Sequence, residues 1–160
     1  MKFSIQVSIA DQRLDLTEDG RVLKRYSVST AMKGPGNTKN SGQTPIGKHY
    51  IRAKIGGGAP ENTVFVGRRT TGEIYSQALA EQYPERDWIL TRILWLCGMQ
   101  PGINRLGNVD SMQRYIYIHG TPDCEPMGIP LSHGCIRMRN ADIMELFDRI
   151  GYGTEVEILL

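Results

Sequence analysis

Apolar and polar side chains alternate at both ends of this 160-residue chain. In residues 2–9 every second residue is apolar, from Phe3 to Ile9, and the closing segment 154–160 alternates in the same way. A period of two places successive side chains on opposite faces of an extended strand, so that one face can be buried. We therefore expect a mainly β fold that begins and ends with a strand.

Further segments combine apolar runs or alternation with flanking turn residues. Asp19-Gly20 is a hairpin signal inside residues 13–29. Residues 30–45 are crowded with Gly, Pro, Asn, Ser and Thr, and we expect a long loop there. The internal strands expected from these patterns are 13–29 on either side of the turn, 46–55, 62–67, 73–79 and 115–120.

Two segments favour helices. Residues 78–96 lose the alternation and space their apolar side chains with a helical period. Residues 140–151 begin with the N-cap candidate Asn140, repeat apolar residues with the same period, and end at Gly151. The sequence predicts a helix in both places.

Composition and length predict one soluble domain spanning residues 1–160. Hydrophobic residues make up 40% of the chain and charged residues 22%, as in ordinary globular proteins. The net charge of +2 comes without a basic run, so we expect no nucleic-acid partner. No stretch has the apolar length of a transmembrane helix, so we expect no membrane partner.

Cysteine usage bears on the compartment. Cys97, Cys124 and Cys135 leave one thiol unpaired in any disulfide scheme, and the first residues do not resemble a secretory signal. These features predict a cytoplasmic protein, or a periplasmic one if a leader precedes this sequence.

Residues 115–139 concentrate the reactive side chains. His119, Cys124, His133 and Cys135 lie within seventeen residues. A cysteine attacks as the thiolate, and a neighbouring histidine is the usual base that forms it. His133 and Cys135 are two residues apart and need not meet in an extended backbone, whereas His119 can approach from the end of an adjacent strand.

The residues around Cys135 suit acyl transfer. Gly134 lets a substrate approach the main chain closely, so the amides of Gly134 and Cys135 are candidate donors to an oxyanion. Arg137 can pair with a substrate carboxylate as a planar fork.

Other interpretations of the cluster stay open at this point. Cys135 can equally be a small buried core residue. His119, Cys124, His133 and Cys135 are also four zinc-competent ligands, although neither a C-x-x-C nor an H-x3–5-H pair occurs. We expect neither a metal nor a cofactor.

The run "IYIHGT", followed by "SHGCIRM" with twelve residues between His119 and Ser132, resembles the active-site signature of L,D-transpeptidase catalytic domains. Upstream, "VSTAMKGPGN" and "TPIGKHYI" are similar to the Ser-Thr-Gly loop and the Thr-Pro-x-Gly strand entry of that family, with Ala31 where Gly is common.

This resemblance implies a twisted β-sandwich with one or two helices. It makes Cys135 the nucleophile and His119 the general base, oriented by a backbone carbonyl for which Gly120 or its neighbour is the candidate. It also makes Ser132 and His133 shape the oxyanion region. Arg137 would hold the substrate.

The implied substrate is a murein peptide or muropeptide, attacked at the L-centre of a diamino acid with release of terminal D-alanine. In a cytoplasm we expect an L,D-carboxypeptidase that trims murein tetrapeptides during cell-wall recycling. The alternative is an L,D-transpeptidase that forms cross-links or exchanges D-amino acids. From another class, the rival is a non-enzymatic zinc-binding or cell-wall-binding domain.

Residues 87–115 extend beyond the shared motifs. We expect a helix and a loop that border the cleft and offer Arg92 or Arg105 to substrate carboxylates. The alternative is a helix that only covers the sheet and exposes its arginines.

Overall fold

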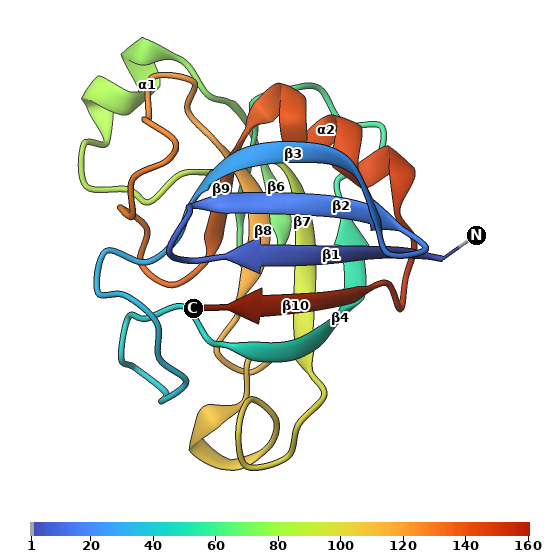
Figure 1. Ribbon diagram of the computed structural model, residues 1–160. Helices are drawn as coiled ribbons and strands as arrows, with labels where there is room; N and C mark the ends of the chain where they lie inside the picture. Colours follow the sequence, from blue (N-terminus) through green and yellow to red (C-terminus); the bar gives the residue numbers. More distant parts are fainter. Residues whose placement is uncertain (1) are drawn as a thin grey trace.

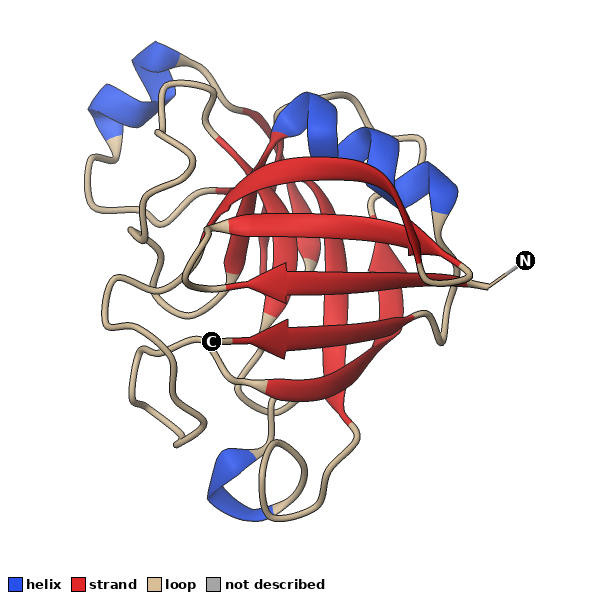
Figure 2. Ribbon diagram, viewed as in Figure 1, coloured by secondary structure: helices blue, strands red, loops and turns tan. Residues whose placement is uncertain are grey.

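A computed structural model describes residues 2–160 as a mainly β fold with two α-helices. The strands join in the order β4-β10-β1-β2-β3-β9-β8-β7-β5-β6, and β4 also pairs with β7. All strands except β5 and β6 therefore form a closed ring, which Figures 1 and 2 show as a barrel.

The element bounds follow the chain. The first six strands are β1 (Phe3–Ser8), β2 (Arg13–Glu18), β3 (Arg21–Ser29), β4 (Gly47–Ile55), β5 (Thr63–Val66) and β6 (Arg69–Ile74). The remaining elements are α1 (Gln77–Gln82), β7 (Ile89–Gly98), the 3-10 turn η1 (Gly107–Val109), β8 (Tyr117–Thr121), β9 (Ile136–Arg139), α2 (Asn140–Arg149) and β10 (Glu155–Leu159).

The alternating ends of the sequence are confirmed as neighbouring strands. β1 pairs in parallel with β10 and antiparallel with β2. Ile5 and Val7 of β1 and Val156 and Ile158 of β10 join the largest buried cluster, while the residues between them are more exposed. Burial of the alternate apolar side chains thus holds the two termini of the chain in one sheet.

The hairpin and the C-terminal helix are also confirmed, but Asn140 is the first residue of α2 and not its N-cap, which is Arg139. Asp19 and Gly20 both have positive φ angles, as the two central residues of a type I′ turn require. In α2, Ile143, Leu146 and Phe147 are buried, and the helix packs against β7, β8 and β9. Figure 1 shows α2 lying along one side of the barrel, which leaves the region near α1 uncovered by it.

The helix expected over residues 78–96 is wrong for most of its length, as is the strand expected over 73–79. Only α1 is helical there, and Ser76 caps it by accepting a hydrogen bond from the Leu79 amide at 3.1 Å. β7 is buried along almost its whole length, because neighbouring elements cover both of its faces. A register shift near Thr91, whose φ is +76°, further disrupts the alternation.

No helix among residues 2–160 is long and apolar enough to cross a membrane.

His49 of β4 is a buried histidine that serves the fold. Its ring lies 3.0 Å from the Gly47 carbonyl through Nδ1 and 2.8 Å from the Ser111 hydroxyl through Nε2. Burial lowers the pKa of His49 to about 4, against the opposing effect of the Gly47 carbonyl. The ring is therefore neutral in the folded protein, and Ser111 donates to Nε2.

This depressed pKa predicts a loss of stability in acid. The unfolded chain binds a proton at His49 below about pH 6.5 and the folded chain does so only near pH 4, so the free energy of unfolding falls as pH drops through this window. The expected loss is about 3 kcal/mol. Urea unfolding of the wild type and of His49→Gln between pH 7 and pH 4 measures it. Equal pH slopes for the two proteins would contradict the assignment.

Candidate active site

The parallel pairing of β8 with β9 brings the histidine and cysteine motifs together. His119 lies opposite Arg137 in the register of the two strands. Residues two apart share a face of a strand, so Tyr117 and His119 point to the same side as Cys135 and Arg137. These four side chains line one cavity of about 530 Å³. Its other charged or aromatic lining residues are Arg68, Asp87, Arg114, Tyr115 and His133.

Cys135 is half-buried at the entry to β9. Its Sγ accepts a hydrogen bond from the Tyr117 amide at 3.3 Å and lies 3.3 Å from the Tyr115 carbonyl, to which the thiol donates. Burial raises the pKa of Cys135 to about 12, although the Tyr117 amide acts in the opposite direction. The Cys135 side chain is therefore a neutral thiol near pH 7, and a base must remove its proton before it can attack a carbonyl.

His119 is buried and oriented by one hydrogen bond. Nδ1 lies 2.6 Å from the Gly120 carbonyl oxygen, which can only accept, so Nδ1 carries the proton. Nε2 is then left with its lone pair. Burial lowers the pKa of His119, while the Gly120 carbonyl and the charge of Asp87 oppose the shift. The ring is neutral near pH 7 and its Nε2 can take up a proton.

Gly120 also answers a packing constraint. A β-carbon at this position would collide with the Asn140 side-chain oxygen and lie 2.6 Å from the Leu90 carbonyl. No larger residue fits without moving β7 or the start of α2. The glycine therefore lets the strand that carries His119 sit close to its neighbours.

The loop before Cys135 is held from two sides. The Ser132 hydroxyl donates to the Cys135 carbonyl at 2.5 Å and accepts from the Gly134 amide at 3.2 Å. The Thr44 hydroxyl donates to the Gly134 carbonyl at 2.9 Å and accepts from the Ala31 amide. The two upstream motifs, which contain Ala31 and Thr44, thus position the loop that carries Cys135.

These bonds bear on the expected oxyanion donors. The Gly134 amide is already used within the loop, because it donates to Ser132 Oγ. Gly134 itself has a φ of +135°, a conformation that favours glycine. Of the two expected oxyanion donors, only the Cys135 amide therefore remains a candidate. Ser132 contributes by holding the loop through its two hydrogen bonds.

Asp87 belongs to none of the sequence motifs, yet its carboxylate contacts two of the expected site residues, His133 and Arg137. Its Oδ1 lies 3.0 Å from Arg137 Nη2 and its Oδ2 lies 3.3 Å from His133 Nδ1. Burial alone would raise the pKa of Asp87, but His119, Arg137 and His133 outweigh it and lower the pKa. Arg137 is therefore paired with a carboxylate of the protein, a contact that competes with its expected role as a substrate clamp.

Arg92 and Arg105 do not line the cavity. Arg92 lies on β7, where it is buried, donates to the carbonyls of Ala59 and Thr91, and stacks 5.5 Å from the Phe147 ring of α2. Arg105 lies in a turn that ends β7, bridged to Pro101. Residues 89–98 form a central strand instead of the helix expected at the cleft, and neither arginine is therefore placed at the cavity that contains Cys135.

The remaining cavity residues give no signal in the sequence. Arg68 comes from the β5–β6 turn, and Arg114 and Tyr115 come from the segment before β8. Arg114 donates to the Gly36 and Gln43 carbonyls and to the Ser41 hydroxyl, and so attaches residues 30–45 to the wall of the cavity. Only the tertiary contacts identify these side chains.

The histidines and cysteines of the cluster are not arranged as metal ligands. Cys124 is exposed and lies outside the cavity. Among residues 2–160, no three His, Cys, Asp or Glu side chains are grouped to hold a metal ion. The part of the chain that the structure describes therefore contains no cluster of ligands that would support the zinc-binding alternative.

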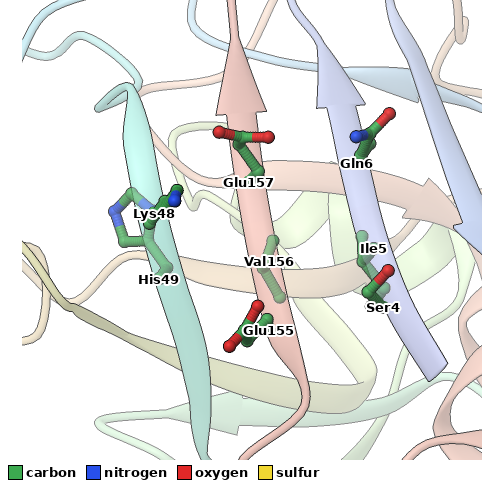
Figure 3. Close-up of a pocket in the computed structure, with 8 residues that line it drawn as sticks. All are labelled: Ser4, Ile5, Gln6, Lys48, His49, Glu155, Val156 and Glu157. Atoms are coloured by element: carbon green, nitrogen blue, oxygen red, sulfur yellow. The ribbon is translucent and has the colours of Figure 1, made fainter. Parts of the chain in front are cut away.

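A second, smaller hollow of about 210 Å³ lies on β1, β4 and β10 (Figure 3). It shares no residue with the cavity at Cys135, and its lining includes Lys48, Glu155 and Glu157. It offers no cysteine, and its histidine, His49, is bound to Ser111.

The neutral state of Cys135 predicts its response to iodoacetamide. Only the thiolate reacts, so the rate at Cys135 should rise about tenfold per pH unit from pH 7 to pH 10, with the exposed Cys124 modified first at pH 7. Mass spectrometry of the digested protein follows each cysteine separately. A rate at Cys135 that is already constant near pH 7 would instead indicate a preformed thiolate–imidazolium pair.

Part of the chain is similar in sequence to known proteins. Over 46 residues it is 44% identical to the probable L,D-transpeptidase YbiS of Escherichia coli strain K12 and 48% identical to the probable L,D-transpeptidase ErfK/SrfK of Salmonella typhimurium. Each match covers 29% of this chain and 15% of the relative. The chain thus matches only a small part of these relatives.

Solved structures resemble nearly the whole chain. The L,D-transpeptidase from Mycobacterium smegmatis has a TM-score of 0.57 at 16% identity, covering 99% of this chain and 59% of that one. L,D-transpeptidase 3 from Mycobacterium tuberculosis has a TM-score of 0.60 at 14% identity, with 99% and 61% covered. These likenesses confirm the expected fold.

At the level of the family, residues 2–158 match YkuD, the L,D-transpeptidase catalytic domain. With nearly the whole chain matched, this protein belongs to the L,D-transpeptidase catalytic-domain family.

Proposed function

We propose that this protein forms a thioester on Cys135 with the stem peptides of peptidoglycan. The observation that carries the proposal is the meeting, in one cavity, of a neutral thiol and a neutral imidazole whose Nδ1 is held by Gly120. This arrangement suits a base-assisted attack on a carbonyl. Membership of the family supports a peptide of the cell wall as the acyl donor.

In the proposed reaction Cys135 Sγ attacks the carbonyl carbon of the third peptide residue, and His119 Nε2 takes the thiol proton. The Cys135 amide stabilises the oxyanion. The C–N bond to the terminal D-alanine then breaks, and His119 returns the proton to the leaving amine. The product is a thioester between the peptide and Cys135, plus free D-alanine.

The second step decides between two activities. We propose hydrolysis first, in which His119 activates water and the protein acts as an L,D-carboxypeptidase on murein tetrapeptides in the cytoplasm. This choice rests on the compartment expected from the sequence, which cell fractionation tests. The second candidate is transfer to an amine, and it is supported by the relatives, which are named as probable L,D-transpeptidases.

A murein tetrapeptide incubated with the purified protein tests the function. We expect a mass increase on Cys135 equal to the tripeptide acyl group, followed by free tripeptide and D-alanine. Cys135→Ala should form neither product, and His119→Ala should lower kcat by about two to four orders of magnitude, as for a lost general base. Dimers or exchanged terminal residues would assign transfer instead of hydrolysis. Complete inertness of the wild type would remove the enzymatic proposal.

Thr44 provides a test of how the nucleophile loop is positioned. Thr44→Val leaves the Gly134 carbonyl and the Ala31 amide without their hydroxyl partner, whereas Thr44→Ser keeps both bonds. We expect Thr44→Val to lose about 1–3 kcal/mol of unfolding free energy and to lower kcat more than KM changes. Thr44→Ser should stay near wild type in both measurements. Equal kcat values for the two variants would show that the hydroxyl does not position the loop.

A further inference from the structure

Arg68 occupies an unusual place in the backbone. It is the second residue of the two-residue turn Gly67-Arg68 that joins β5 to β6, where Val66 pairs with Arg69. The φ angles of the two turn residues are +57° and +66°. Turns of this type favour glycine or asparagine in both positions, because a β-carbon crowds the backbone there. An arginine at this position needs a compensating reason, and strained residues of this kind concentrate at functional sites.

The side chain of Arg68 points into the cavity that contains Cys135. Its Nη1 donates to the Tyr117 hydroxyl at 2.9 Å. Its guanidinium carbon lies 4.6 Å from the centre of the Trp95 ring and 4.8 Å from that of Tyr115. These contacts hold the guanidinium beside the two rings, while the Tyr117 bond uses only one of its five N–H donors.

The other two arginines of the cavity are already committed. Arg137 pairs with Asp87, and Arg114 donates to three oxygen atoms of residues 36–43. Arg68 forms no ion pair with any carboxylate of residues 2–160. Arg68 is thus the cavity arginine that, within the described residues, combines a charge paired with no carboxylate and a single hydrogen bond.

We propose that Arg68 binds a carboxylate of the acyl donor and determines which peptides the site accepts. A guanidinium fork with unused donors matches the geometry of a carboxylate. The inference rests on the proposed function for its ligand, since a stem peptide carries carboxylates at its C-terminus and on residues within the chain. The structure points to a carboxylate as the bound group, and the experiment identifies which carboxylate of the peptide it is.

Binding separates this proposal from catalysis. Titration calorimetry uses the Cys135→Ala protein, which cannot form the thioester, with the tetrapeptide and with analogues in which each carboxylate in turn is a carboxamide. We expect Arg68→Gln in this background to weaken binding of the unmodified peptide by about tenfold to a hundredfold. For the analogue that lacks the recognised carboxylate, the proteins with and without the Arg68→Gln substitution should bind equally.

Arg52 provides a matched control. Its guanidinium lies 5.7 Å from the same Trp95 ring, but Arg52 is exposed and does not line the cavity. Arg52→Gln removes the same charge and a contact with the same ring, so it should leave the affinity unchanged. Arg68→Lys keeps the charge without the fork and should recover only part of the lost affinity.

The outcomes distinguish the two proposals. Equal affinities with and without Arg68→Gln, or the same loss for every analogue, would overturn the role of Arg68 even if the wild type turns the peptide over. If Arg52→Gln loses as much affinity as Arg68→Gln, the effect is one of long-range charge. That result would also overturn the proposed role of Arg68. If the Cys135→Ala protein does not bind the tetrapeptide and the wild type does not cleave it, the proposed function itself fails, and the role of Arg68 fails with it.

Discussion

The parallel pairing of β8 with β9 is the constraint on which the site depends. Its register sets His119 opposite Arg137, so that both reactive motifs project from one face. A slip of one residue would turn Cys135 and Arg137 to the opposite face, because side chains alternate along a strand. The strands can lie this close to β7 and α2 because Gly120 has no β-carbon. The pairing of β8 with β9 therefore determines how His119 and Cys135 are placed relative to each other.

Burial then sets the protonation states at this face. It raises the pKa of Cys135 and lowers the pKa of His119, so both groups are neutral at rest. Such a pair differs from a preformed thiolate–imidazolium pair, because the thiol must lose its proton before it can react.

The sequence predicted those features that depend on local patterns. Alternation identified the terminal strands, a helical period identified α2, and a short motif singled out Cys135 and His119, which line one cavity. Prediction failed at β7, because a strand covered on both faces loses alternation and its β-bulge at Thr91 mimics a helical spacing. It also missed Asp87, whose significance comes only from contacts with residues about fifty positions away.

The distribution of charge in the cavity shows why spacing cannot identify a substrate-binding arginine. Arg137 follows Cys135 by two residues, but its charge is already paired with the Asp87 carboxylate through Nη2. Arg92 lies near the same motifs in the sheet, yet its side chain is buried toward α2. Arg68 is far from the motifs in sequence and reaches the cavity only because β5 pairs with the start of β7. The arginine available to a substrate is thus decided by which carboxylates the fold has already paired, a property of the whole cavity.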